Sequence, residues 1–458
     1  MAFPPNQLRQ RRANLAASSV PAALSSFLLV IVALSLPVPC RPFPLLPSRP
    51  RPLPLPLHWS RLSRSRSRSR SRPARVTGLA AGADAGADAD AGADAGASSE
   101  AGPRPTAPPR ATSVICVGET LYDSLPDAIY LGGAPTNVAV HLCGLGVPAA
   151  VASCVGPDRL GDEAVRRLGL RGVGCGYVQR HGGGWSTGVV AAEVDPRTGD
   201  ATYSFDTPAA WDGLELTEDL RELIAGDGDG DGCGGGVVAV IGTVAARLGS
   251  KGGATSAATV MAVRDLATDV VLDVNLRPPW YDPGAVIALA RGGGYGGDDD
   301  GRKLALLKLN DEELPIMEEW CGLGSGGKPS SLSGEGLRER MGALAGAMNA
   351  RKVCVTRGAN GAALWCAGSR TGDEGEGERG AFEENEGFSR REESGCDTVG
   401  AGDAFLAAMV RSLLLDREGP EVALRRACAL GAYVASCRGA VPDHGKAPQD
   451  LRDVFAYD

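Results

Sequence analysis

Short apolar runs recur along the chain from residue 113 onward, and between them apolar residues return every three or four positions. The first pattern is typical of strands buried on both faces, and the second of amphipathic helices that cover such strands. Together they predict strands over 113–119, 149–154, 237–241, 270–274, 304–309, 352–356 and 362–366, and helices over 162–170, 256–267, 311–320, 335–350, 401–415 and 421–437. Alternation of strands and helices on this scale indicates an α/β fold, with a mostly parallel sheet and helices on both of its faces.

A different pattern marks three segments in the first half of this region. Residues 177–179, 187–194 and 201–205 alternate apolar and polar positions, which is typical of half-buried strands. We expect these three strands to form a small sheet that stands apart from the main one. Surface insertions are predicted for the Gly-, Asp- and Ser-rich segments 226–236, 292–302 and 322–334 and for the acidic segment 367–395.

The N-terminal part of the chain differs from the rest in composition. An apolar run over 20–36 follows a basic start, and its uninterrupted core is short for a membrane span, so it fits the hydrophobic region of a signal peptide. Residues 41–83 are rich in Arg, Pro and Ser and contain no acidic residue, as in an organellar transit peptide. We therefore predict a signal-like leader over 1–40, a transit-like segment over 41–80, a low-complexity linker over 81–112 and a folded domain over 113–458.

This order of segments resembles the bipartite leaders of algae with complex plastids. We expect import into a plastid, and a mature form without a membrane segment. The alternatives are secretion or a membrane anchor, and a mitochondrial or cytosolic location. Ser63–Arg72 alternates Ser and Arg, which would suit an RNA-binding tract, but a disordered basic leader that is removed on import explains it better.

Charge and cysteine content narrow the function of the folded part. The chain has a net charge of −8, and its first 83 residues hold thirteen Arg and no acid, so the remainder is strongly acidic, which argues against nucleic-acid binding. The twelve Cys include no C-x-x-C pair and no Cys/His cluster at metal-ligand spacing, so we expect scattered buried thiols in a reducing compartment. Only four His occur, which argues against a mechanism that rests on a histidine base.

The stretch Cys396–Phe405 combines small residues with a carboxylate at the start of a predicted helix. Gly400, Ala401 and Gly402 let the backbone approach a ligand, and their N–H groups lie at a helix N-terminus, where free donors and the helix dipole favour an anion. Asp403 follows at once and would repel that anion. Its position is explained if it takes a proton from a hydroxyl that attacks a phosphorus held by those N–H groups. The simpler explanation is an acidic helix cap.

Further polar groups follow other predicted strands. Gly132 and Gly133 precede Asn137, which is expected to open a helix either as its N-cap or as a ligand contact. Asp273, Asn275 and Arg277 follow strand 270–274, and Arg277 can neutralise a phosphate, hold a substrate oxygen or form a surface salt bridge.

Two more groups complete this set. Asn310 and Glu313 fit a capping box by position, and they equally fit a polar pair near a Mg²⁺–phosphate cluster. Thr356 and Gly358 form a turn that can reach a nucleotide. Ligands bind at the carboxyl ends of parallel strands, so these groups predict a phosphoryl-transfer site on one rim of the sheet, although the chain lacks a P-loop motif.

Two of these stretches carry a resemblance to a known family. Asp397–Phe405 resembles the signature of the ribokinase-like (PfkB) carbohydrate kinases, and Gly132–Ala139 resembles their other signature in its fructokinase form. The runs that follow the family order are Gly118–Glu119 with Asp123, Asp273–Trp280, Lys308–Glu313, Val355–Gly358 and Cys437–Ala440. The similarity covers about 113–445 and is strongest toward bacterial-type fructokinases with a short lid.

The resemblance implies a Rossmann-like α/β domain with a small β-sheet lid, mainly residues 120–132 and 174–211. It implies ATP as phosphoryl donor, Mg²⁺ as cofactor and often a monovalent cation such as K⁺ near the anion hole. By motif match, Asp403 would be the catalytic base, and the N–H groups of Gly400, Ala401 and Gly402 would form the anion hole. The remaining roles implied are sugar binding for Asp123, Gly133, Asn137 and Arg277, nucleotide binding for Thr356, Gly358, Asn310 and Thr398, ordering of the Mg²⁺ shell for Asn310 and Glu313, and a monovalent cation contact for Asp397.

We therefore expect an ATP-dependent fructokinase that converts D-fructose to fructose 6-phosphate, as a monomer or homodimer. One alternative is another kinase of this fold that acts on 2-keto-3-deoxygluconate, ribose or a nucleoside, because fold and signature do not fix the sugar. The other is a non-enzymatic fructokinase-like part of the plastid transcription machinery, against which the intact Gly400, Gly402 and Asp403 argue. The long acidic segment 367–395 and the short lid leave lid closure and oligomer contacts open.

Overall fold

The structure is a computed structural model of the chain. It describes residues 112–124, 128–194, 201–205, 207–226, 236–247, 254–278, 280–292, 304–324, 333–368, 380–388, 396 and 398–457. All of these residues belong to one compact unit, Glu100–Asp458. The predicted leader over 1–80, and the linker up to residue 111, lie outside the described residues.

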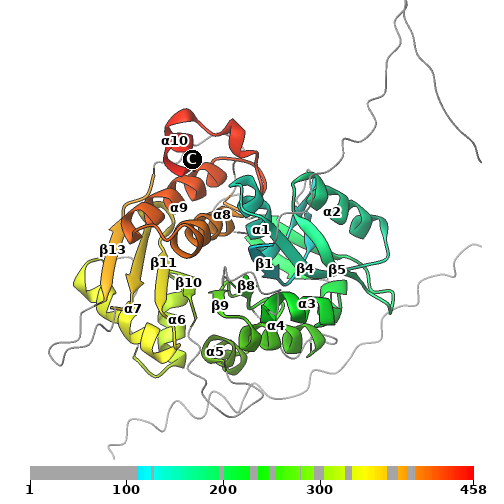
Figure 1. The fold of residues 1–458 in the computed structure, drawn as a ribbon, viewed down its shortest axis with the longest axis horizontal. Helices are drawn as coiled ribbons and strands as arrows, with labels where there is room; N and C mark the ends of the chain where they lie inside the picture. The colour runs from blue at the N-terminus through cyan, green and yellow to red at the C-terminus, as the bar shows by residue number, and fades with distance from the viewer. Residues whose placement is uncertain are drawn as a thin grey trace, which may run out of the picture. The chain divides into compact units, whose positions relative to one another are not determined.

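The main sheet has nine strands in the described part of the chain, in the order β13-β12-β11-β10-β9-β8-β1-β4-β5 (Figure 1). Its parallel strands are β1 (Val114–Val117), β4 (Ala149–Val155), β5 (Gly174–Arg180), β8 (Val238–Gly242), β9 (Asp269–Asp273), β10 (Leu306–Asn310) and β11 (Lys352–Thr356). Two antiparallel strands, β12 (Ala362–Cys366) and β13 (Ala381–Asn385), extend it beyond β11. Every residue of β1, β4 and β8 is buried, which explains their unbroken apolar runs and confirms the mostly parallel sheet.

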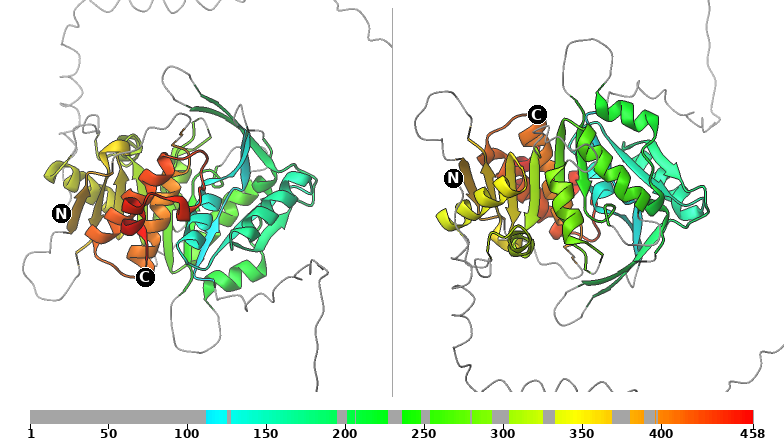
Figure 2. Two further views of the ribbon diagram at one scale, coloured as in Figure 1. Left: turned by 90° about the horizontal axis from the view of Figure 1, so that it is seen from above. Right: turned by 90° about the horizontal axis from the view of Figure 1, so that it is seen from below.

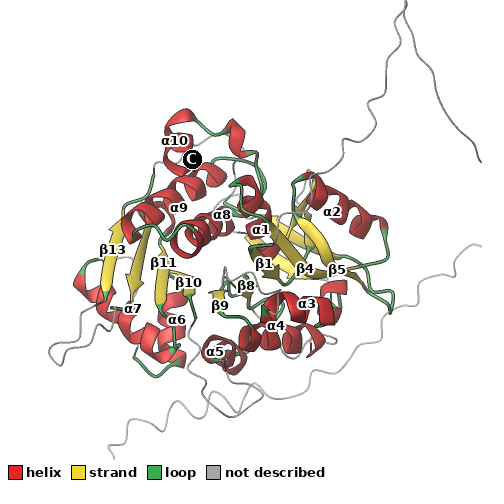
Figure 3. Ribbon diagram, in the orientation of Figure 1, coloured by secondary structure: helices red, strands yellow, loops and turns green. Residues whose placement is uncertain are grey.

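Helices cover both faces of this sheet (Figure 3). One face carries α1 (Ala134–Gly144), α2 (Arg159–Leu170), α8 (Ala401–Val410) with a π-helical turn over Arg411–Leu415, α9 (Pro420–Ala435) and α10 (Gln449–Phe455). The other carries α3 (Glu218–Ala225), α4 (Ala254–Leu266), α5 (Pro283–Arg291), α6 (Glu313–Trp320) and α7 (Glu335–Ala347). Each face of the sheet has its own hydrophobic core, and side chains alternate between the two faces along a strand. Val114 and Cys116 of β1 therefore belong to the first core, on the face covered by α1 and α8, and Ile115 and Val117 belong to the second, on the opposite face.

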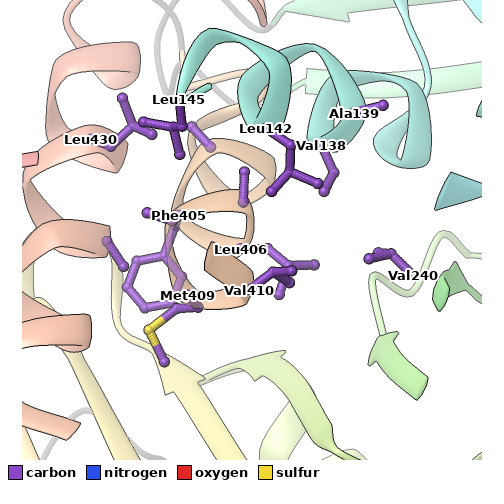
Figure 4. Close-up of a cluster of buried hydrophobic side chains, with 14 of the residues drawn as sticks. Val138, Ala139, Leu142, Leu145, Val240, Phe405, Leu406, Met409, Val410 and Leu430 are labelled. Atoms are coloured by element: carbon purple, nitrogen blue, oxygen red, sulfur yellow. The ribbon is translucent and has the colours of Figure 1, made fainter. Parts of the chain in front are cut away.

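The first core fixes the two helices that carry the sequence signatures. All residues of α8 from Ala404 to Val410 are buried, and Val138 and Leu142 of α1 point toward Leu406 and Val410 (Figure 4). Burial of each such large aliphatic side chain contributes about 2 kcal/mol. The N-termini of α1 and α8 are therefore held in a fixed relation to each other.

A second sheet has the order β3-β2-β6-β7 and lies beside the main sheet in both views of Figure 2. Its strands are β2 (Leu121–Ser124), β3 (Ile129–Gly132), β6 (Gly188–Val194) and β7 (Ala201–Phe205). The prediction of a small separate sheet is confirmed, but the placement of 177–179 within it is wrong. That segment belongs to β5, which pairs in parallel with β4 at the edge of the main sheet. An edge strand is half exposed, so its alternating pattern resembles that of a strand in a separate sheet.

Three further predictions need correction. Helix α1 begins at Ala134, with Gly133 as its N-cap, so Asn137 lies one turn inside the helix instead of opening it. The acidic segment 367–395 is not wholly an insertion, because Ala381–Asn385 forms strand β13. Helices over 401–415 and 421–437 were the last ones predicted, but a further helix, α10, follows them. Within the described residues, no helix is both long and apolar enough to cross a membrane.

Candidate active site

A cavity of about 290 Å³ opens where the parallel strands of the main sheet end. Glu119 follows β1, Val244 follows β8, and Asn275 follows β9, while Asn310 and Thr356 are the last residues of β10 and β11. The small sheet contributes Leu121, Asp123 and Val190, and the start of α8 contributes Gly400, Gly402 and Asp403. The prediction that the motifs after successive strands share one rim is confirmed.

Helix α8 presents its N-terminus to this cavity. Gly400 is the N-cap with a φ of 77°, a conformation that residues with a Cβ rarely adopt, and a Cβ there would lie 2.5 Å from Cα of Ala440. The first-turn N–H groups, including that of Gly402, have no acceptor within their own helix. The ammonium of Lys308 adds positive charge beside this helix start. Its Nζ is so close to Gly402 that a Cβ on this glycine would lie 3.2 Å from it. The helix start and the ammonium together offer hydrogen-bond donors to an anion.

Asp403 lies in the first turn of α8 and faces the same cavity. Its Oδ2 accepts a hydrogen bond of 2.8 Å from Nδ2 of Asn137, which projects from α1. Burial, followed by the nearby Asp273 carboxylate, raises the pKa of Asp403 to about 6, although Asn137, Lys308 and Arg277 oppose the shift. A carboxylate with such a pKa is ionised at neutral pH and still able to accept a proton, as a general base must be.

A buried ion pair lies beside Asp403. Nζ of Lys308, in β10, donates to both carboxylate oxygens of Asp273, in β9, at 2.9 and 3.2 Å. Lys308 is only 7% exposed, and the surrounding carboxylates raise its pKa above the usual value despite burial. This lysine therefore stays charged and offers a fixed cation next to the start of α8.

Glu119 connects the end of β1 to the start of α1. Its Oε1 accepts the N–H of Ala134 at 3.1 Å, while its backbone carbonyl accepts from Oγ1 of Thr136 at 3.0 Å. Gly133 lies directly against this carbonyl with a φ of 102°, so the loop needs glycine there. Burial, above all, raises the pKa of Glu119 to about 7, and the charge of Asp403 contributes to the rise. Glu119 is therefore a second titratable carboxyl in the wall of the cavity.

Asn310 and Glu313 form a reciprocal cap between β10 and α6. Oδ1 of Asn310 accepts the N–H of Glu313 at 2.8 Å, and Oε2 of Glu313 accepts the N–H of Asn310 at 2.9 Å. The other oxygen of Glu313 accepts the N–H of Leu276 at 2.7 Å, which joins the loops after β9 and β10. Both carboxylate oxygens are thus engaged, and in the described part of the chain no group of three or more His, Cys, Asp or Glu side chains could hold a metal ion. A Mg²⁺ ion would fit here only through water and through the phosphates of a bound nucleotide.

A second, more apolar cavity of about 240 Å³ adjoins the first, sharing Thr356, Thr398 and Gly402 with it. Its walls come from Gly358 and Ala359 after β11, from Gly387 and Phe388 after β13, and from α8 and α9. Ala401 and Phe405 line it from α8. The start of α8 therefore separates a polar cavity from an apolar one.

The structure brings together nearly all the residues that the sequence suggested. The polar cavity contains Asp403, Gly400, Gly402, Asp123, Gly133, Asn137, Arg277, Asn310, Thr356 and Thr398, and the apolar one contains Ala401 and Gly358. Glu313 supports the rim from behind without lining either cavity, and Asp397 lies outside the described residues. Glu119 and Lys308 were not among the candidate site residues. The sequence did carry a signal for Lys308, because it stands inside the apolar strand β10. A lysine is rarely buried unless it pairs with another charge or serves a function.

Comparison with known proteins agrees with this arrangement. The model of the pfkB family carbohydrate kinases matches residues 127–225 and 302–445, just over half of the chain. The chain belongs to this family. The unmatched stretch between the two ranges contains β8 and β9, which lie in the middle of the nine-stranded sheet of this chain.

Individual relatives and solved structures are similar over most of their length. A fructokinase of Rhizobium leguminosarum bv. trifolii is 26% identical over 318 residues, which cover 66% of this chain and 80% of the relative. The crystal structure of a fructokinase from Xylella fastidiosa with bound ATP has a TM-score of 0.54 at 20% identity, over 72% of this chain and 93% of that one. A fructokinase from Vibrio cholerae O395, in a form with fructose, ADP and calcium bound, has a TM-score of 0.53 at 20% identity, over 76% and 99%. At this identity the structures establish the shared α/β fold with its small separate sheet.

Proposed function

We propose that this pfkB-family kinase transfers the γ-phosphoryl group of ATP to a sugar hydroxyl, with D-fructose as the substrate and fructose 6-phosphate as the product. The observation that carries the proposal is the position of Asp403. Its carboxylate lies in a polar cavity, at the N-terminus of a helix suited to an anion, and is oriented by Asn137. A base beside an anion site is what proton removal from an attacking hydroxyl requires.

The reaction assigns a task to each group. Asp403 accepts the proton of the sugar hydroxyl as its oxygen bonds to the γ-phosphorus, and the bond from that phosphorus to the β–γ bridging oxygen breaks to release ADP. The N–H groups of Gly400 and Gly402 and the ammonium of Lys308 face the charge of the transferred group. The N–H of Ala401, which the motif match assigned to the anion hole, instead donates to the carbonyl of Thr398 at 3.3 Å. Asp123 and Asn137, with Gly133 and Arg277, position the sugar, so most of the acceleration comes from placement and electrostatics.

The nucleotide is assigned to both cavities. The apolar cavity, which Gly358 lines, suits the base and ribose, and Thr356 and Thr398 lie between it and the polar one. Mg²⁺ would neutralise the phosphates of the bound nucleotide, with Asn310 near its water shell and Glu313 holding Asn310 in place. The roles of Asp397 and of K⁺ stay predictions. ATP and a metal ion are supported by the ATP-bound Xylella structure and by the Vibrio structure with ADP and calcium.

Fructose is favoured over other sugars by the relatives. Both the Rhizobium protein and a Salmonella typhimurium protein, 24% identical over 341 residues, carry the name fructokinase. The Vibrio structure was obtained with fructose bound.

The test measures ADP release by the purified full chain with ATP, Mg²⁺ and each of fructose, ribose, 2-keto-3-deoxygluconate and adenosine. Fructose should give the highest kcat/KM. The variant Asp403→Asn keeps the size of the side chain but cannot accept the proton. Its kcat should fall about 10²- to 10⁴-fold, which is the usual contribution of a general base, while ATP still binds. The control Asp450→Asn, on the exposed side of α10, should be unchanged.

Three outcomes would contradict parts of the proposal. A strong preference for another sugar overturns the substrate but keeps the kinase. A near-normal kcat for Asp403→Asn overturns the base. No turnover with any sugar would favour a non-enzymatic role.

A further inference from the structure

A buried histidine, His141, and a half-buried one, His444, lie behind the anion pocket, and the reaction as proposed does not use them. His141 is 1% exposed and projects from α1 one turn after Asn137. Its Nε2 lies 2.9 Å from the carbonyl oxygen of Ala440, and its Nδ1 lies 2.9 Å from Nε2 of His444. The two rings are nearly parallel, with an interplanar angle of 6° and centroids 5.2 Å apart, as expected for two rings that form a hydrogen bond edge to edge.

The protons of this pair can be assigned from its partners. A carbonyl oxygen only accepts, so Nε2 of His141 carries a hydrogen. Burial, followed by the proximity of His444, lowers the pKa of His141 to about 3, so the ring is neutral and its Nδ1 is an acceptor. Nε2 of His444 must then be the donor. The chain of hydrogen bonds runs in one direction, from His444 through His141 to the Ala440 carbonyl.

Ala440 forms part of the wall behind the anion pocket. The Cα and O atoms of Ala440 would each lie 2.5 Å from a Cβ on Gly400, so its backbone packs directly against the N-cap of α8. Its neighbour Gly439 has a φ of 74° and packs against the ring of Tyr130 on β3. The backbone at 439–440 is therefore fixed between the small sheet, the start of α8 and His141.

One helix thus reaches the site at two points. Asn137 and His141 are four residues apart on α1, so they lie on the same face. Asn137 holds the carboxylate of Asp403, and His141 holds the backbone on which Gly400 rests. A shift of about 1 Å at either point is large for phosphoryl transfer, because misplacement on that scale can cost about 10²-fold in rate.

We propose that His141 is a positioning residue, which holds the Ala440 backbone against Gly400 through its Nε2–H donor, and that His444 fixes the tautomer that makes this bond. The inference rests on the proposed function, in which Gly400 belongs to the anion hole.

The test compares substitutions of His141 that differ in this one donor. In His141→Gln the amide nitrogen replaces Nε2, so most of kcat should be retained. In His141→Leu the donor is lost at similar size, and kcat should fall about 10- to 100-fold while KM for the sugar stays near the wild-type value. The control His181→Leu changes a histidine that stacks on Trp185 and lines neither cavity, so kcat should not change.

If His141→Leu does not fold, as judged by its thermal transition, His141→Asn replaces it. Its shorter amide can face His444 but cannot reach Ala440, so the same loss of kcat is expected. A kcat equal to wild type in the folded variant that lacks the donor, or an equal loss in His141→Gln, overturns the inference.

A second measurement does not depend on activity. ¹⁵N NMR of the histidine-labelled full chain should show His141 neutral around neutral pH, with hydrogen on Nε2 and none on Nδ1. A charged ring or the opposite tautomer overturns the inference even if the kinase is active. Conversely, absence of kinase activity in the wild type counts against the proposed function and leaves the tautomer result to be judged separately.

Discussion

Two carboxyl groups of the cavity have pKa values that burial, above all, and neighbouring carboxylates have raised into the working range of an enzyme. The pKa of Asp403 is raised to about 6 and that of Glu119 to about 7. When two such groups interact, the proton losses belong to the pair, and the group with the higher pKa keeps its proton while the other is charged. Near neutral pH this leaves Asp403 ionised and Glu119 partly protonated, so Glu119 adds less than a full negative charge beside the transferred phosphoryl group.

This pairing predicts a bell-shaped dependence of kcat/KM on pH. Asp403 must be charged to accept a proton, so the rate should fall as pH drops below about 6. Ionisation of Glu119 adds a negative charge near the phosphates, so the rate should also fall as pH rises above about 7. Glu119→Gln keeps the acceptor for the N–H of Ala134 and removes the second ionisation. Its profile should keep the acidic limb and lose the alkaline decline.

Steady-state kinetics across the pH range check this prediction. The control is Glu421→Gln, an exposed residue in the first turn of α9, which should reproduce the wild-type profile. An alkaline decline of the same size in Glu119→Gln would show that another group causes it.

At the residue scale, the sequence predicted those site residues that stand in a distinctive local sequence. Asp403 and Asn137 were found because small residues and a helix start surround them. Glu119 was not proposed as a site residue, because one acidic residue after a strand is common and only the fold shows its side chain at the start of α1. The cap formed by Asn310 and Glu313 could be predicted, because the two residues stand at the sequence spacing of a capping box. The third hydrogen bond, between Glu313 and Leu276, joins residues 37 positions apart, so no local sequence pattern predicts it.

At the scale of elements, the start of α8 needs glycine at position 400 for two reasons: the backbone there has a positive φ, and Ala440 packs closely against it. A second glycine of the chain, Gly172, allows the two effects to be measured separately. Gly400 and Gly172 have nearly the same φ, 77° and 78°. A Cβ on Gly400 would collide with Ala440, whereas a Cβ on Gly172 would meet no atom within 4 Å. Alanine at either position should cost about 1–2 kcal/mol in stability for its left-handed conformation.

Gly400→Ala should lose more than this, because the anion hole and the 439–440 backbone must move apart. We expect a large loss of kcat for Gly400→Ala and none for Gly172→Ala, with the greater fall in melting temperature also in Gly400→Ala. Thermal melts and ADP release on the two variants measure both effects. Equal kcat values would mean that the collision with Ala440 is relieved without disturbing the site.

The sequence predicted whether a segment is a helix or a strand more readily than it predicted which sheet a strand joins. The apolar runs predicted most strands of the main sheet, because strands buried on both faces consist mostly of apolar residues. Lys308 and Asp273 are exceptions, and they pair with each other. The pattern did not assign β5 to a sheet, since half-exposed edge strands look alike in sequence. It also placed the start of α1 too late, because a Gly–Ala–Pro start carries no side-chain cap and no apolar period in its first turn.

At the scale of the whole molecule, charge is divided unevenly. The first 83 residues carry thirteen Arg and no acid, and the remainder is acidic, so the two would attract each other at low ionic strength. Every residue that lines either cavity lies between Glu119 and Ala435. We propose that residues 1–80 direct the chain to a plastid and take no part in catalysis.

A chain that begins at Thr112 should therefore fold and phosphorylate sugar with the kcat and KM of the full chain. The comparison is made at low and at physiological ionic strength, because a basic leader that reached the acidic rim would change KM mainly at low salt, where charges are least screened. Equal constants under both conditions support an independent folded domain. A salt-dependent difference in KM would instead mean that the leader contacts the site and that the boundary near residue 112 separates two interacting parts.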